Sequence, residues 1–176
     1  MSKGDRPDTR TIHVGELRKR LGQRLDVAID VILDEQVVVG SRTLPTPVVG
    51  SLVIESIERG VSAVGEIRFE SEGDCRRCLE PVRGVIDVTI AEIFQVGAPP
   101  DSEIIDFDGE TADLLPIVRD AVALSLPLAP LCDDDCAGPD PERYPALTAE
   151  QVAVAEEEAR PGLDPRWAAL DDLDLT

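Results

Sequence analysis

The chain has 176 residues and a formal net charge of −19, and its only aromatic residues are three Phe, one Trp and one Tyr. This length allows one domain with tails, whose core we expect to be aliphatic. No apolar run approaches the ~20 residues of a membrane-spanning helix, so we expect no membrane partner. The first residues lack the apolar segment of a secretory signal, which predicts a cytoplasmic protein.

The negative charge is concentrated after residue 83. Residues 1–83 hold 13 of the 17 Lys and Arg against 14 acidic residues, which leaves four basic and 22 acidic residues for the rest of the chain. A strongly acidic chain is repelled by a phosphate backbone, so the composition argues against nucleic-acid binding, and we expect no DNA partner. A local cluster of arginines, such as Arg76, Arg77 and Arg83, can still attract phosphate groups although the net charge of the chain is negative.

The first half of the chain carries the alternation of β-strands. Apolar residues from Leu25 to Leu33 alternate with more polar ones, as in a strand with one buried face. The same reasoning predicts strands at 49–56, 60–71 and 82–96, and a short helix at 14–21. Antiparallel strands that follow one another in sequence predict a curled sheet or a small barrel.

The second half predicts one more strand and one principal helix. A short strand is predicted at 104–107, and a helix at 113–126 with Asp113 as its N-cap and Pro116 in its first turn. Residues 126–131 contain two prolines, which end the helix in an extended arm that delivers Cys132. We infer that this arm reaches back toward Cys78.

The predicted fold class is therefore α+β, a curled antiparallel β-sheet or small barrel with one principal helix after the strands. Residues 1–136 form the β-rich domain with its closing helix and cysteine arm. Residues 137–176 form a loosely structured acidic tail, with a helix candidate at 148–160 whose Thr148 has the spacing of a capping box. The segment 164–170 either docks onto the domain or binds a partner.

All four cysteines lie in two close pairs, Cys75 with Cys78 and Cys132 with Cys136. Four thiolates in this pattern suit one structural zinc ion, which would join two distant parts of the chain. A redox dithiol is disfavoured because the segment after Cys78 breaks helices. Reduced, unligated thiols and two disulfides both remain open, although disulfides need an oxidising compartment.

No catalytic constellation is visible, and we expect no enzyme. His13 is the only histidine, and it reads as a partly exposed strand residue. The sequence has no Gly-rich phosphate loop and no nucleophile spaced with a histidine. Asp106, Asp108 and Glu110 lack the spacing of an EF-hand and read as an acidic loop.

Several motifs occur in a distinctive order. They are C-x-x-C-L-x-P-V at 75–82, I-D-F-D-G-E at 105–110, D-L-L at 113–115, L-P-L-A-P-L-C-D-D-D-C at 126–136 and D-P-R-W at 164–167. This order resembles the YceD family, the large ribosomal RNA subunit accumulation proteins. The resemblance runs from about Val27 to Leu170. Many relatives continue with a third C-x-x-C, which residues 137–141 lack, so a metal site here has four ligands at most.

The resemblance implies a bacterial cytoplasmic factor that supports synthesis, processing or stability of large-subunit ribosomal RNA, with that RNA or a pre-ribosomal particle as its partner. Arg76, Arg77 and Arg83 are then the predicted RNA contacts, at a basic tip between two strands. The alternative is an acidic interaction module or chaperone for a basic ribosomal protein, without direct RNA contact and with an affinity that falls with salt.

Overall fold

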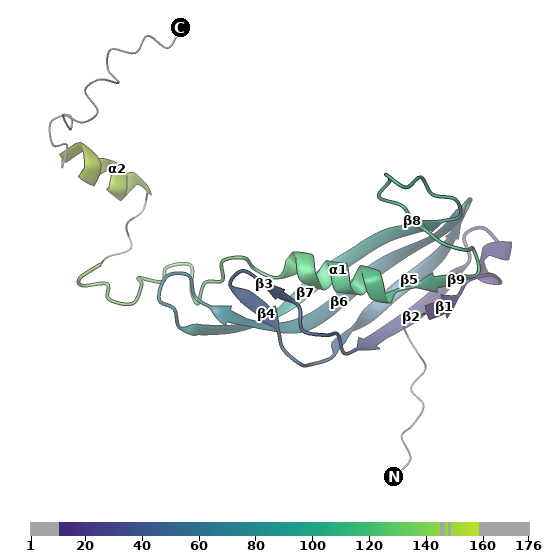
Figure 1. Cartoon of the computed structure of the whole chain (residues 1–176), viewed down its shortest axis with the longest axis horizontal. Helices are drawn as coiled ribbons and strands as arrows, with labels where there is room; N and C mark the ends of the chain where they lie inside the picture. The colour runs from purple at the N-terminus through teal and green to yellow at the C-terminus, as the bar shows by residue number, and fades with distance from the viewer. Residues whose placement is uncertain (1–10, 145–146, 148, 159–176) are drawn as a thin grey trace, which may run out of the picture.

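The computed structural model describes residues 11–144, 147 and 149–158. The fold is dominated by a seven-stranded sheet built around four long antiparallel strands (Figure 1). In spatial order these strands are β2 (Arg24–Val31), β5 (Val48–Ile57), β6 (Gly60–Asp74) and β7 (Pro81–Gln95). All four were expected from their alternating sequence, so the long strands are confirmed.

Short strands extend the sheet at its margins. β4 (Ser41–Thr43) pairs with β6 beyond the end of β5, and β3 (Val37–Val38) pairs with β4. β8 (Ile105–Asp106) lies within the predicted strand 104–107 and runs parallel to β7. The β3–β4 hairpin is not predicted from the sequence, because strands of two or three residues are too short to show an alternating pattern.

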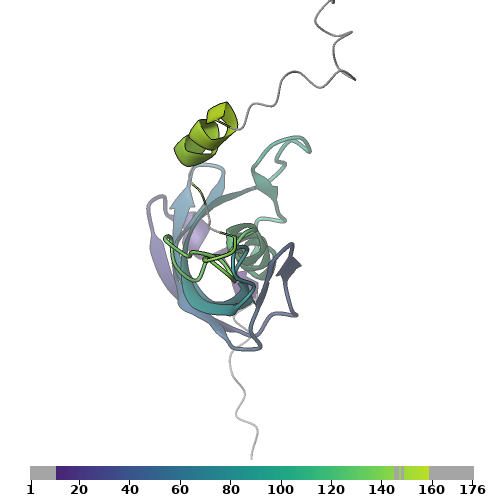
Figure 2. The same ribbon diagram turned by 90° about the vertical axis from the view of Figure 1, so that its left-hand side faces the viewer.

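The sheet is curled but not closed. Within the described residues, β2 pairs only with β5 and β8 only with β7, so the two edges do not meet. Figure 2 shows the sheet wrapping around the helix α1 (Leu115–Ser125). The predicted curled sheet is confirmed and the alternative of a closed barrel is wrong, because α1 covers the concave apolar face that a barrel would bury by closure.

The concave face carries the hydrophobic core. Leu52 and Ile54 of β5 point into it together with Ile117, Val118 and Val122 of α1. The core is aliphatic as predicted, with Phe69 and Phe94 as its buried aromatic residues among those described. This packing fixes α1 along the sheet, and so fixes where the chain after the helix emerges.

The helix α1 begins one residue later than predicted. Its N-cap position is Leu114, although the Asp113 side chain still accepts a hydrogen bond from the Leu115 backbone N at 3.0 Å. Pro116 lies in the first turn as expected, where a missing N–H costs no intrahelical bond. After Ser125 the backbone becomes extended at Leu126, which begins the predicted arm.

The predicted short helix 14–21 is present only as a single turn. The structure has a strand β1 (Thr11–His13) followed by a single 3₁₀ turn η1 (Leu17–Lys19). β1 pairs with β9 (Thr111–Asp113), and the Val14 backbone N donates to the Glu110 carbonyl at 2.8 Å, so the chain is extended up to the start of the predicted helix. Arg20 is already extended, and the Gly22 backbone N donates to the Ser56 carbonyl at 2.8 Å, so tertiary pairing ends the helical turn early. His13 lies in β1 and is exposed, as expected.

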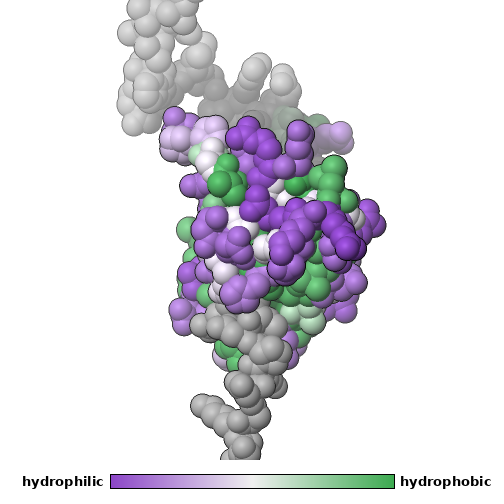
Figure 3. Space-filling model, turned by 90° about the vertical axis from the view of Figure 1, so that its right-hand side faces the viewer, coloured by the Kyte–Doolittle hydropathy of each residue, from purple (hydrophilic) through white to green (hydrophobic). Residues whose placement is uncertain are grey.

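Figure 3 views the end of the sheet opposite the cysteines, where hydrophilic side chains dominate and apolar patches are separate. The helix α2 (Ala149–Glu158) falls within the predicted range 148–160 and is set apart from the sheet in Figure 1. Its predicted cap Thr148 and the segment 164–170 lie outside the described residues. None of the helices in the described part is long and apolar enough to cross a membrane.

Candidate metal centre

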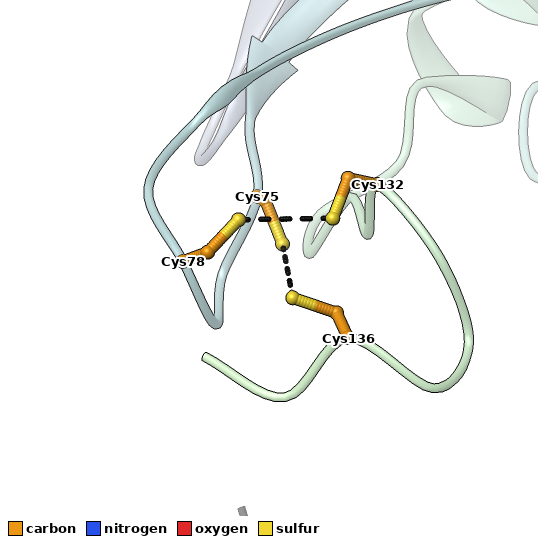
Figure 4. Close-up of side chains that lie close together, drawn as sticks. All are labelled: Cys75, Cys78, Cys132 and Cys136. Atoms are coloured by element: carbon orange, nitrogen blue, oxygen red, sulfur yellow. Dashed lines mark hydrogen bonds between the residues drawn. The ribbon is translucent and has the colours of Figure 1, made fainter. Parts of the chain in front are cut away.

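The two cysteine pairs meet at one end of the sheet (Figure 4). Cys75 and Cys78 lie in the loop between β6 and β7, and Cys132 and Cys136 lie at the end of the arm that follows α1. The first pair therefore occupies the predicted tip between two strands. The arm reaches back to Cys78, as inferred from the sequence.

The four sulfur atoms form a compact cluster. The Sγ atoms of Cys75 and Cys136 are 3.8 Å apart, those of Cys78 and Cys132 are 3.7 Å apart, and all four lie within 4.8 Å of one another. These separations exceed the ~2 Å of a disulfide, and all four cysteines are free. A tetrahedral zinc ion with Zn–S bonds of ~2.3 Å sets its sulfurs about 3.8 Å apart, so the cluster fits zinc.

The backbone of the first loop is folded tightly around Cys75. The Cys75 backbone N donates to the Glu80 carbonyl at 2.9 Å, and the Leu79 N donates to the Cys75 carbonyl at 2.8 Å. Leu79 has a φ of 63°, in the left-handed region that non-glycine residues seldom adopt. The Arg77 backbone N points at the Cys75 sulfur, 3.4 Å away. This arrangement leaves the Cys75 side chain fully buried.

The second loop is built on a turn that Asp133 stabilises. The Cys136 backbone N donates to the Asp133 carbonyl at 3.1 Å, and the Asp135 N donates to the Asp133 side chain at 2.8 Å. This Asx turn brings Cys132 and Cys136 to the same side of the loop. Of the three aspartates in the motif, Asp133 thus has a structural role in presenting the thiols.

The arm between α1 and Cys132 lies against the end of the sheet. The Ser41 hydroxyl donates to the Pro127 carbonyl at 2.7 Å, and the Arg76 backbone N donates to the Pro130 carbonyl at 3.0 Å. Pro130 is buried. These contacts join the arm to β4 and to the first cysteine loop, and so they bring the second cysteine pair to the first.

The thiols differ strongly in acidity. Backbone N–H groups of Cys78 and Cys132 point at the Cys75 sulfur and lower the pKa of Cys75 to about 6. Hydrogen bonding with the thiols of Cys136 and Cys78 raises the pKa of Cys132 to about 12. One thiolate is therefore stabilised by the backbone, whereas four close thiolates need a cation to offset their repulsion.

The three arginines of the predicted basic tip have different surroundings. The Arg77 guanidinium donates to backbone carbonyls of the second cysteine loop. Arg83 pairs with Glu72, with 2.9 Å between Nη2 and Oε2. Arg76 is exposed, and within the described part of the chain its guanidinium forms neither a hydrogen bond nor an ion pair. The structure thus brings the arginines to one end of the molecule but gives them separate contacts.

Sequence reasoning missed Arg42 at this tip. Arg42 lies on β4 and pairs with the other side of Glu72, with 2.6 Å between Nη2 and Oε1. Hydrogen bonds from Arg42, and then the charge and hydrogen bond of Arg83, hold the pKa of Glu72 below its usual range. A groove of about 540 Å³ lies beside this cluster. Only the unpredicted β3–β4 hairpin places Arg42 here, so no sequence signal could have found it.

A family model described as "Large ribosomal RNA subunit accumulation protein YceD" matches residues 63–174. The chain belongs to the YceD family. The match covers most of β6, all of β7 and α1, and both cysteine pairs, which confirms the resemblance seen in the order of the sequence motifs.

Other YceD-like sequences come from mycobacteria. Uncharacterized proteins of Mycobacterium bovis and Mycobacterium tuberculosis are each 35% identical over 128 residues, which cover 69% of this chain and 59% of the relative. An uncharacterized protein of Mycobacterium leprae is 31% identical over 134 residues, covering 72% and 59%. The YceD chain thus spans about three fifths of these curated relatives. No solved structure matches it.

Proposed function

We propose that this YceD-family chain is a non-enzymatic cytoplasmic factor that supports synthesis, processing or stability of large-subunit ribosomal RNA. The family match over residues 63–174 carries the proposal, because its description names accumulation of that RNA. The matched region contains all four cysteines, which meet at one end of the sheet, and also Arg76, Arg77 and Arg83. We place the working surface of the protein at this end.

We further propose that Cys75, Cys78, Cys132 and Cys136 hold one structural zinc ion. The separations of their sulfur atoms support this, and so do the free thiols. Four thiolate ligands leave no open coordination position, so the ion would stabilise the fold rather than activate water. It would fasten the arm after α1 to the loop between β6 and β7.

The exposed arginines at this end are the proposed RNA contacts. Arg76 has a free guanidinium among the described residues, and Arg83 and Arg42 flank Glu72 at the surface with donors to spare. Arginine donors suit phosphate oxygens, which position a protein on RNA without reading its sequence. Because the chain as a whole is acidic, we expect this contact to be local and sensitive to salt.

The second candidate function is an interaction module or chaperone for a basic ribosomal protein, without RNA contact. The observation that favours it is the charge of the chain after residue 83, which has 22 acidic and four basic residues. A basic partner would gain electrostatic attraction from this half, and the affinity would fall as salt screens it. Arg76 and Arg83 would then be dispensable.

Depletion of the protein in its host tests the main proposal. We expect the ratio of large-subunit to small-subunit ribosomal RNA to fall, or large-subunit precursors to accumulate, and wild-type protein to restore the normal ratio. A double variant Arg76→Glu/Arg83→Glu should restore it poorly. Unchanged large-subunit RNA after complete depletion would refute the proposal.

Isolation of the tagged protein with its partners separates the two candidate functions. If RNA is the direct partner, nuclease treatment should release the bound ribosomal material. If a basic ribosomal protein is the direct partner, that protein should stay bound after nuclease treatment and dissociate in high salt. The double arginine variant should lose its partners only in the first case.

A further inference from the structure

We propose that Arg77 is a positioning residue of the metal centre rather than an RNA contact. Its guanidinium holds the loop of Cys132 and Cys136 in the arrangement that four-thiolate coordination needs. The inference rests on the proposed zinc site and assigns a role to the second arginine of the C-R-R-C motif.

Arg77 contacts both cysteine loops at once. Its side-chain Nη1 donates to the Asp134 carbonyl at 2.7 Å and to the Cys136 carbonyl at 3.0 Å, although these residues lie 57 and 59 positions further along the chain. Its own backbone N points at the Cys75 sulfur at 3.4 Å. One residue therefore connects a ligand of the first pair with the backbone that carries a ligand of the second.

The Arg77 guanidinium also places a positive charge beside a strongly negative loop. Four thiolates around Zn²⁺ leave a net charge of about −2, and Asp133, Asp134 and Asp135 lie between two of the ligands. Among the described residues, Arg77 is the one whose cationic group donates to this loop. A hydrogen bond from a charged donor to a carbonyl is stronger than a neutral one, and the side chain is only partly exposed to water.

Arg76, the adjacent residue, provides the contrast. Its backbone N donates to the Pro130 carbonyl, but its guanidinium is exposed and has no partner among the described residues. The two arginines are thus chemically identical neighbours, and only one of them reaches across to the second loop. Groups outside the ligand set that fix ligand orientation commonly change metal affinity by about 10- to 100-fold when removed.

The experiment compares Arg77→Gln with Arg76→Gln in the full-length chain, since both remove one positive charge from the same loop. Zinc affinity is measured by competition with a chromophoric chelator, and site geometry by the thiolate absorption of the cobalt(II)-loaded protein. We expect Arg77→Gln to lower zinc affinity about 10- to 100-fold and to release the ion faster. Arg76→Gln should match wild type, and Arg77→Lys should recover part of the loss by restoring the charge.

RNA binding provides a readout that separates positioning from contact. With saturating zinc, Arg77→Gln should bind a large-subunit RNA fragment as wild type does, whereas Arg76→Gln should bind it more weakly. Equal zinc affinities for the two variants would overturn the inference, and so would an RNA defect of Arg77→Gln at saturating zinc. A wild-type chain that binds neither zinc nor cobalt would instead refute the proposed metal site, and the inference with it.

Discussion

Replacing Gly73 with alanine tests how closely the β3–β4 hairpin and the arm must approach β6. A Cβ at Gly73 would overlap the Gly40 carbonyl oxygen on the adjacent hairpin, and would lie 3.0 Å from Ser41 Cβ and 3.1 Å from Pro130 Cγ. The overlapped atom belongs to the backbone, so a strand has to move. Gly84 on β7 is a matched control, because nothing lies within 4 Å of a Cβ built there.

The two alanine variants should change stability in opposite directions. Forcing an extra carbon into a filled space costs about 1–3 kcal/mol, so Gly73→Ala should lower the free energy of unfolding by that amount. Alanine at an open strand position restricts the unfolded chain and stabilises by about 0.5–1 kcal/mol. We therefore expect the free energies of unfolding of the two variants to differ by about 1.5–4 kcal/mol.

Urea unfolding followed by circular dichroism measures this difference, with zinc and with a chelator in turn. Because the displaced backbone also supports Pro130, two residues before Cys132, Gly73→Ala should weaken zinc binding while Gly84→Ala should not. Equal unfolding free energies for the two variants would refute the steric reasoning. A destabilised Gly73→Ala variant with wild-type zinc affinity would show that the arm does not depend on this approach.

Three further outcomes are expected. With free zinc at about 100 times its dissociation constant, binding adds about 2.7 kcal/mol, so a chelator should lower the wild-type Tm by about 5–11 °C and leave the Tm of Cys75→Ser unchanged. Leu52→Ala in the core should cost about 2–5 kcal/mol in urea unfolding, whereas Leu124→Ala, whose side chain is 87% exposed, should cost almost nothing. Hydrogen bonds from the backbones of Thr111 and Glu110 lower the pKa of Asp108, so its stabilisation is present above the unfolded-state pKa and is lost as pH falls through the lowered value. The Tm difference between wild type and Asp108→Asn should therefore close on acidification, and a constant difference would contradict the assignment.

The sequence predicted the parts of the fold that depend on local pattern. The long strands from β2 to β7 alternate over eight or more residues, and Pro116 and the prolines of the arm delimit α1. Barrel closure could not be decided in this way, because alternation shows which face of a strand is buried but not what covers it. The helix predicted at 14–21 is only one turn long for a related reason, since the Gly22 backbone pairs with Ser56 of β5, a contact that the local pattern does not show.

The candidate site was predictable as a set of ligands but not as a structure. Four cysteines in two close pairs, with no others in the chain, indicate that the pairs meet. The different roles proposed for Arg76 and Arg77 follow from their contacts, because the Arg77 guanidinium faces the turn at Asp133 and that of Arg76 does not. The backbone geometry of both loops sets this difference, and the sequence does not show it. Arg42 reaches the same end of the sheet only through a hairpin too short to be visible in the sequence.

The separation of the cysteine pairs along the chain also sets the order in which the protein can mature. Cys78 and Cys132 are 54 positions apart, and β7, β8, β9 and α1 all lie between them. During synthesis the first pair therefore leaves the ribosome well before the second, and the site cannot close until α1 has emerged and docked. β1 is separated from its partner β9 by an even longer part of the chain, so the two can pair only after that part has been synthesised. Pairings of such long range fold slowly, so a bound ion would mark a chain whose sheet and helix are already assembled.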